Sequence, residues 1–190
     1  NTQVKNNIIT YVKNVTNEKN SDYIPPVDRI ATFDNDGTLW VETPVIQLLF
    51  SFYQVKQMSA SDPSLISIQP FKAVINNDNK YLENMTMEEQ TSLVLKTQTG
   101  TNIYSFQKKV RDFIFSNNDP KLNIPIAKAV YQPQLELISY LRTNGFRVYI
   151  CSGGDIDFMR AVSLELYGIP PENVIGSYFK YNYDTEKSEI

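Results

Sequence analysis

The stretch "FDNDGTLW" (Phe33–Trp40) places two carboxylates, Asp34 and Asp36, directly after a short apolar run. Like charges this close repel each other, and burial at the end of a strand strengthens the repulsion. A bound cation is the natural way to offset that cost. Gly37 permits a tight turn with the backbone close to a ligand. The stretch therefore predicts a strand that ends in an acidic, cation-binding turn.

The composition is that of an ordinary globular protein. The chain has 190 residues, of which 42% are hydrophobic and 21% are charged, so we expect one domain, or one domain with a sizeable insertion. The net charge of -3 favours neither a nucleic acid nor an acidic membrane as partner. No apolar run approaches the roughly 20 residues of a membrane span. The sequence leaves the oligomeric state open.

Rare and missing residue types narrow the chemistry. The chain has no histidine, which excludes histidine triads and histidine metal sites, so acid–base chemistry near neutral pH falls mainly to carboxylates. Cys151 is the single cysteine, and we expect it to be a small buried strand residue. If Asn1 is a processed terminus, the protein is expected to be periplasmic or secreted, and otherwise cytoplasmic.

Strand and helix patterns alternate toward the end of the chain. A short buried strand is predicted at Arg29–Phe33, a short apolar strand at Phe146–Cys151 and a third strand at Asn173–Phe179. An amphipathic helix is expected from Pro133 to Gly145, and "DIDFMRAVSLELYG" (Asp155–Gly168) predicts one more helix after an "SGGD" turn. This alternation predicts an α/β fold, a Rossmann-like parallel sheet flanked by helices.

The middle of the chain predicts helices rather than strands. Thr43 is a good N-cap and Pro44 suits a first helical position, so a helix is expected to begin there. Polar residues dominate from about Ser59 to Ile124, where Thr86-x-x-Glu89 forms a capping-box pattern. We therefore predict that residues 1–40 and 130–190 form a Rossmann-like core and that residues 41–129 form a helical cap over the site.

Two polar turns are expected at one edge of the sheet, because ligands of parallel sheets bind at the carboxyl ends of the strands. In the second turn, the Ser152 hydroxyl and the Gly153 N–H are donors for phosphate oxygens, and Thr38 adds a hydroxyl from the first. Each turn alone is more often a simple turn or helix cap. Their occurrence together, in this order, favours a phosphate site with Ser152 across from Asp34.

The acidic turn suits Mg²⁺, which prefers oxygen ligands and keeps several waters. The Asp34 carboxylate and the Asp36 backbone carbonyl could supply two ligands. Asp34 could then attack phosphorus, while the Asp36 side chain acts as acid and base. Glu42 is either a solvated acid near the start of a helix or a substrate contact.

These motifs resemble the haloacid dehalogenase-like hydrolase superfamily. "FDNDGTLW" is similar to its first motif, D-x-D-G-T after a strand, and "VYICSGGD" is similar to its second, a strand ending in Ser or Thr. The stretch from Tyr140 to Ser177 resembles the phosphoserine phosphatase-like bacterial branch. A dehalogenase is disfavoured, because that branch lacks the second aspartate that Asp36 matches.

The resemblance implies a Mg²⁺-dependent phosphomonoester hydrolase that acts on a small phosphorylated metabolite through an aspartyl-phosphate. It implies that Asp34 is the nucleophile and Asp36 the general acid/base. It also implies Mg²⁺ on the Asp34 side chain and the Asp36 carbonyl, phosphate held by Ser152, and a helical cap.

The chain departs from the superfamily after its third strand. A lysine motif and an acidic motif should follow, but neither Lys180 nor Lys187 has a recognisable motif context, and the carboxy-terminal strands of the core are not visible. We therefore expect the sequence to be the amino-terminal part of a longer protein. Two alternatives remain: a non-catalytic binding domain with the hydrolase fold, and a phosphotransferase or phosphomutase that uses the same aspartate.

Overall fold

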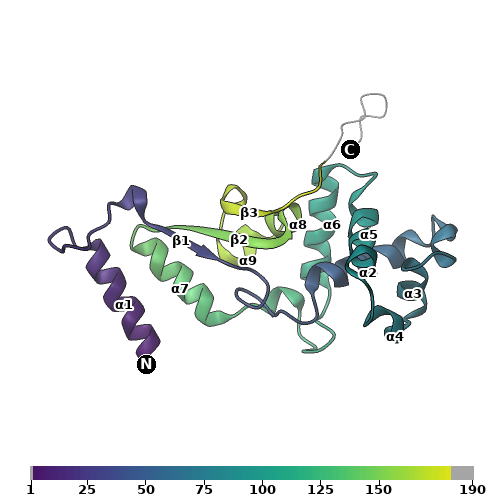
Figure 1. Ribbon diagram of the computed structural model, residues 1–190, viewed down its shortest axis with the longest axis horizontal. Coiled ribbons are helices and arrows are strands. Elements are labelled where there is room, and N and C mark those ends of the chain that lie inside the picture. Colours follow the sequence, from purple (N-terminus) through teal and green to yellow (C-terminus); the bar gives the residue numbers. More distant parts are fainter. Residues whose placement is uncertain (1, 181–190) are drawn as a thin grey trace.

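The structure is a computed structural model that describes residues 2–180. Figure 1 shows an elongated molecule with α1 (Gln3–Thr16) at one end, α3 (Phe71–Asn76) and α4 (Asn79–Leu82) at the other, and a small sheet between them. None of the helices in this part of the chain is long and apolar enough to cross a membrane.

Three parallel strands form the sheet, in the order β1-β2-β3. They are β1 (Ile30–Phe33), β2 (Arg147–Asp155) and β3 (Val174–Ser177). Together with the flanking helices they confirm the predicted α/β fold with a Rossmann-like parallel sheet. The register pairs Phe33 with Ile150, so the residues that follow these two lie at the same edge of the sheet.

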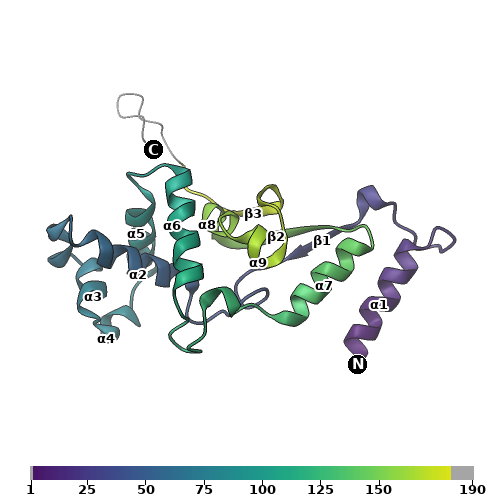
Figure 2. The same cartoon turned by 180° about the vertical axis from the view of Figure 1, so that it is seen from behind.

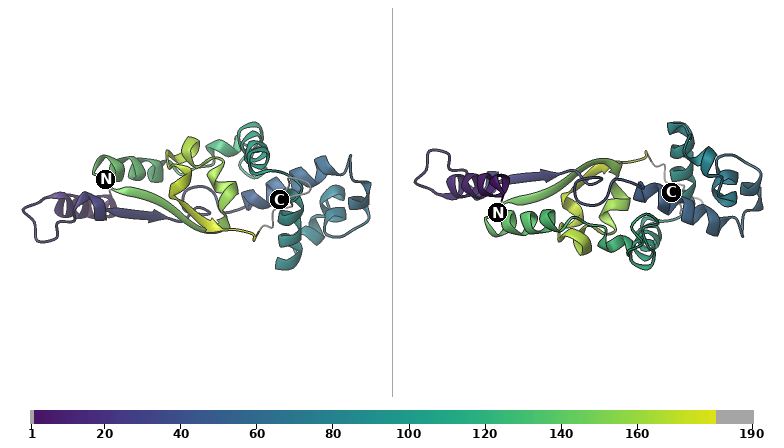
Figure 3. Two further views of the ribbon diagram at one scale, coloured as in Figure 1. Left: turned by 90° about the horizontal axis from the view of Figure 1, so that it is seen from above. Right: turned by 90° about the horizontal axis from the view of Figure 1, so that it is seen from below.

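The helices of the core cover only one face of the sheet. Figure 3 shows α7 (Gln132–Thr143), α8 (Ile156–Arg160) and α9 (Ser163–Tyr167) on the same side, where Val148, Ile150 and Val174 are buried. The opposite face carries exposed apolar side chains, with Ile30 at 53% and Ile175 at 52% of full exposure, beside an exposed Cys151.

Two expectations of burial are therefore wrong. In β1 only Phe33 is buried, and Cys151 is exposed rather than buried. The reason is the alternation of side chains along a strand, which turns every second residue away from the covering helices.

The segment between β1 and α7 is helical and adds no strand to the sheet. Besides α3 and α4 it contains α2 (Ile46–Met58), α5 (Met87–Gln98), α6 (Ile103–Ser116) and the short 3-10 turns Pro63–Ile66 and Ile126–Lys128. Seen from behind in Figure 2, as in Figure 1, α6 stands between α5 and α8. The exact limits of a cap, 41–129, stay a prediction.

Local starts and ends of elements differ from expectation in three places. The helix α2 begins at Ile46 rather than Pro44, because the backbone of Val45 is extended (φ -62°, ψ 111°). The "SGGD" stretch belongs to β2, which continues with an irregularity after Cys151 until Asp155 pairs with Ser177. The strand β3 is shorter than expected at both ends.

The predicted helix from Asp155 to Gly168 is divided into α8 and α9. It breaks at Val162, whose backbone (φ -132°, ψ -10°) leaves the helical region. In contrast, the predicted capping box of α5 is present, with Thr86 accepting from the Glu89 N–H and Glu89 accepting from the Thr86 N–H.

Buried apolar side chains form two clusters. The larger cluster joins the covered face of the sheet to α1, α6, α7, α8 and the first half of α2, and Phe50 in α2 packs edge-on against Phe106, Phe113 and Phe158. The smaller cluster consists of Val55, Val74, Met85 and Leu93. The helix α2 therefore contributes to both clusters, and α6 belongs with the sheet.

Candidate functional site

The acidic turn after β1 is held from within by Asn35. Its carbonyl accepts from the N–H groups of Thr38 (3.1 Å), Leu39 (2.8 Å) and Trp40 (3.3 Å). Its buried side chain accepts from the Tyr167 hydroxyl at 3.1 Å. Gly37 has a φ of +71°, a conformation that side chains rarely adopt. The turn is thus fixed to α9 while its carboxylates stay near the sheet edge.

The two carboxylates of this turn have different surroundings. Asp34 is exposed and accepts from the Asn35 N–H at 2.7 Å. Asp36 is half-buried and accepts from the Trp40 indole N–H at 2.6 Å. Burial raises the pKa of Asp36; the bond from Trp40 opposes this shift, and the charges of Asp34 and Glu42 add to it.

Glu42 is exposed and lies against the same turn. A Cβ built on Gly37 would be 3.3 Å from the Glu42 Cβ and 3.5 Å from its Oε2. Glu42 is therefore close to the acidic pair, although it stands four residues before α2 rather than in its first turn. A third carboxylate here adds negative charge that a cation would relieve.

The second predicted turn lies at the same edge, because the register places Asp34 level with Cys151, one residue before Ser152. The Ser152 Oγ accepts from the Gly154 N–H at 3.2 Å, which leaves the hydroxyl hydrogen available for another acceptor. Gly153 is exposed, and no atom lies within 4 Å of a Cβ built on it. There is thus open space beside Gly153, while Ser152 is half-buried.

Sequence reasoning missed Gln47, which joins the first turn of α2 to the end of β2. Its Oε1 accepts from the Asp155 N–H at 3.1 Å. Its Nε2 is buried and has no hydrogen-bond partner in the part of the chain that is described. A Cβ on Gly154 would be 2.4 Å from this Nε2, so only glycine allows the carboxamide to lie there. No local signal reveals a partner 108 residues away.

Asp155 was also missed as a structural residue of the site. It is buried, and its carboxylate accepts from the Phe158 N–H at 2.7 Å, which caps α8. Burial raises the pKa of Asp155, and hydrogen bonds from Phe158 and Gln98 oppose this shift. Trp40 was likewise not recognised as a partner of Asp36, although the i to i+4 spacing within a turn makes such contact possible.

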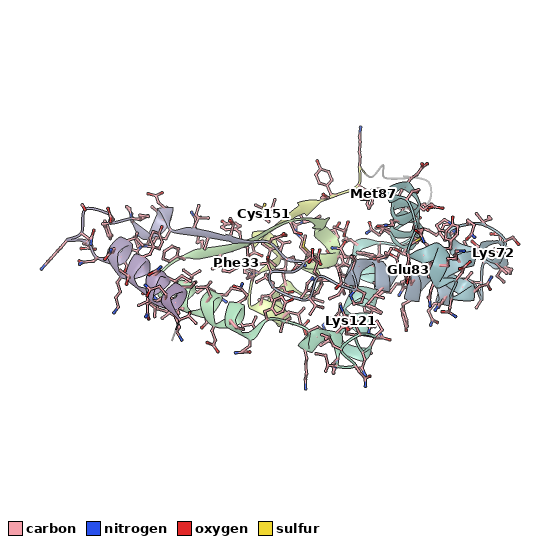
Figure 4. The ribbon with its side chains drawn as sticks, turned by 60° about the horizontal axis from the view of Figure 1, so that its bottom comes forward. Phe33, Lys72, Glu83, Met87, Lys121 and Cys151 are labelled. Carbon is pink, nitrogen blue, oxygen red and sulfur yellow. The ribbon has the colours of Figure 1, made fainter. Side chains whose placement is uncertain are left out.

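A cleft of about 280 Å³ opens between the helices α2 and α5 and the ends of β2 and β3. Its walls include Leu48 from α2, Met87 and Val94 from α5, and Gly153 from the second turn. Figure 4 shows Met87 near the end of the sheet that faces the helical segment, with Cys151 on the sheet itself. The cleft therefore borders the predicted phosphate donors.

A magnesium ion would find oxygen ligands at the acidic turn, but few of them. Among residues 2–180, no group of three or more acidic or cysteine side chains is arranged to hold a metal ion. The Asp34 carboxylate and the Asp36 carbonyl remain as two donors. This set fits a Mg²⁺ that keeps several waters and shares a substrate phosphate.

Comparisons with known proteins define the fold but no family. No protein-family profile and no curated protein matches the chain. A conserved protein of unknown function from Anaerococcus prevotii DSM 20548 matches with a TM-score of 0.55 and 15% identity, over 98% of this chain and 70% of that one. At this identity the likeness concerns the fold alone.

A phosphoserine phosphohydrolase-like protein from Francisella tularensis subsp. tularensis SCHU S4 also matches. The TM-score is 0.39 and the identity is 18%, over 85% of this chain. The chain spans 63% of the length of that protein.

Proposed function

We propose that this chain carries the nucleophile and the general acid of a Mg²⁺-dependent phosphomonoester hydrolase. The observation that supports this most is the pair of carboxylates after β1, with Asp34 exposed and Asp36 half-buried and held by Trp40. Two carboxylates with different surroundings are suited to different roles. The substrate would be a small phosphorylated metabolite.

In the first step, an oxygen of the Asp34 carboxylate attacks phosphorus. A new bond forms between this oxygen and phosphorus, and the bond from phosphorus to the ester oxygen breaks. The leaving oxygen takes a proton from Asp36. The raised pKa of Asp36 supports this role, because it favours the protonated carboxyl.

In the second step, the Asp36 carboxylate takes a proton from a water molecule whose oxygen attacks the same phosphorus. The bond from phosphorus to Asp34 breaks, and inorganic phosphate and a free carboxylate remain. The Ser152 hydroxyl and the Gly153 N–H would donate to phosphate oxygens in both steps. The indole of Trp40 holds the Asp36 carboxylate in place through its hydrogen bond.

Magnesium would be held by the Asp34 carboxylate and the Asp36 backbone carbonyl. When bound, it would neutralise negative charge on the carboxylate and the phosphate, which otherwise repel each other. The nearby charge of Glu42 strengthens the need for a cation at this turn.

The test uses the full-length natural protein and p-nitrophenyl phosphate with Mg²⁺. Asp34→Asn should abolish hydrolysis and the hydroxylamine-sensitive acyl phosphate. Asp36→Asn should retain Mg²⁺ binding, measured by calorimetry, and lower turnover by about 10²–10⁴-fold. Full activity in both variants would overturn the proposal.

A second candidate, a non-catalytic binding domain, is favoured by the small number of metal ligands in residues 2–180. It predicts that the full-length protein binds a phosphate ester at this site without turnover. Ester binding that is lost in a Ser152→Ala variant, together with no acyl phosphate, would support it over the hydrolase.

A further inference from the structure

The cleft beside the second turn has a defined chemical character. The wall on α5 is a single helix face, because its residues follow the spacing i, i+3, i+4, i+7: Met87, Gln90, Thr91 and Val94. The start of α2 and the ends of β2 and β3 complete the lining, with Val45, Gln47, Leu48, Gly153, Gly154, Asp155, Ser177, Tyr178 and Phe179. Apolar side chains and neutral polar groups therefore surround the space.

Charged groups are nearly missing from this cleft. Among the described residues, neither a lysine nor an arginine lines it, and Asp155 is its only carboxylate. That carboxylate is 7% exposed and already accepts from the Phe158 N–H. The nearest basic residue of α5 by sequence, Lys96, is paired with Asp62 at 3.1 Å. Among residues 2–180, the lining of the cleft thus offers no cation for an anionic ligand and no free anion for a cationic one; Lys180, which follows the lining residue Phe179, is exposed and lies outside the lining.

Resting on the function proposed above, we infer that this cleft receives the alcohol part of the phosphate ester, and that this alcohol is uncharged and partly apolar. Gly153 carries the argument, because it belongs both to the phosphate-donor turn and to the lining of the cleft. An ester whose phosphate accepts from the Gly153 N–H would place its alcohol part beside the cleft that α2 and α5 line.

The cost of removing a charged group from water disfavours the binding of charged alcohols in the cleft. A carboxylate, as in phosphoserine, would lose water in the cleft without gaining a cation, and this costs several kcal/mol by typical estimates. An ammonium group would meet Asp155 only by displacing the cap of α8. The volume of about 280 Å³ is at the lower end for ligand sites, so an alcohol of about one ring fits.

The first experiment measures binding without turnover. The Asp34→Asn protein is labelled with ¹³C at its methionine methyl groups, which gives four signals, and Met87 is assigned with a Met87→Leu variant. Phenyl phosphate should shift the Met87 signal at concentrations where phosphoserine, phosphocholine and inorganic phosphate do not. No shift with phenyl phosphate, or an equal shift with inorganic phosphate, would overturn the inference.

The second experiment introduces a lysine into the lining of the cleft and measures the substrate preference. In the full-length enzyme, kcat/KM should be higher for phenyl phosphate than for phosphoserine. Val94→Lys should lower this ratio by tenfold or more, since the new ammonium pairs with a carboxylate. Leu95→Lys is the matched control, because Leu95 is the next residue of α5 and does not line the cleft. It should leave the ratio unchanged.

The two proposals fail in different ways. If Val94→Lys does not fold, Thr91→Lys on the same face replaces it. A wild-type preference for phosphoserine or phosphocholine overturns the inference and leaves the hydrolase intact. If no ester is hydrolysed but Met87 responds to phenyl phosphate alone, the hydrolase fails, and the cleft stands as a site for uncharged aromatic esters.

Discussion

Individual side chains give the two neighbouring carboxylates different surroundings. Asp36 is tied to the fully buried Trp40, which in turn packs edge-on against Phe158 and Tyr167. Asp34 accepts from the Asn35 N–H of its own turn and is open to solvent. The same two-residue spacing therefore gives one exposed carboxylate and one that is held by a buried indole.

We expect Trp40→Phe to lower kcat by about tenfold or more and to change KM little, because a hydrogen bond to a charged group is worth about 1.5–3 kcal/mol. Steady-state kinetics of the full-length enzyme measures both constants. Tyr167→Phe is the control. Its ring also packs against Trp40, and the substitution removes a hydrogen bond to Asn35 instead of one to Asp36. Equal effects of the two variants would indicate a loss of packing only.

The raised pKa of Asp36 predicts a pH dependence of stability. The folded state binds this proton more tightly than the unfolded state, so stability falls as pH rises from the ordinary value of 3.8 through the raised pKa. Without metal, Asp36→Asn should therefore raise the Tm at pH 7, and this gain should vanish below about pH 4. Thermal unfolding in chelator tests it, with the substitution of an exposed aspartate outside the turn, Asp22→Asn, as the control. A gain that is independent of pH would contradict the assignment.

At the scale of elements, the helix α2 contacts the end of β2 at Gly154, beside the Gln47 side chain. We expect Gly154→Ala to lower the Tm by several degrees, because the new Cβ would be 2.4 Å from the Gln47 Nε2. Gly153→Ala is the matched control for thermal unfolding, since nothing lies within 4 Å of its Cβ. A similar decrease in the Tm of both variants would show that the lost backbone freedom of glycine, rather than the contact with Gln47, lowers stability.

Elements were predictable where their signals are local. The capping box of Thr86 and Glu89 marked the start of α5, and the apolar runs marked all three strands. The start of α2 and the break at Val162 were not predictable, since tertiary packing overrides local preference. In the candidate site, the acidic turn was recognisable from its local sequence. The contact of Gln47 with Asp155 was not, because it exists only after folding.

At the scale of the molecule, the division into two clusters should be visible in hydrogen exchange. Leu93→Ala removes a buried side chain from the smaller cluster, at a cost of about 2–5 kcal/mol. We expect faster exchange in α3, α5 and the second half of α2, with unchanged protection in β2. Ile150→Ala, in the larger cluster, should speed exchange in the sheet. Global loss of protection in Leu93→Ala would mean a single cooperative unit.

The parallel sheet and the helical middle of the chain followed from sequence patterns, but the covering of the sheet did not. Ile30 and Cys151 were predicted to be buried strand residues because each belongs to an apolar run. Their exposure depends on which face of the sheet α7, α8 and α9 cover, and the sequence of a strand does not determine this.

The face of the sheet opposite α7, α8 and α9 has a practical use. It displays the only thiol of the chain, one residue before Ser152 and on a strand fixed by pairing to both neighbours. On this 190-residue chain, a maleimide dye would therefore attach at a single place, beside the predicted phosphate donors and outside the cleft. The molecule provides its own position for a fluorescent reporter, which would follow ligand binding in real time without any engineered attachment point.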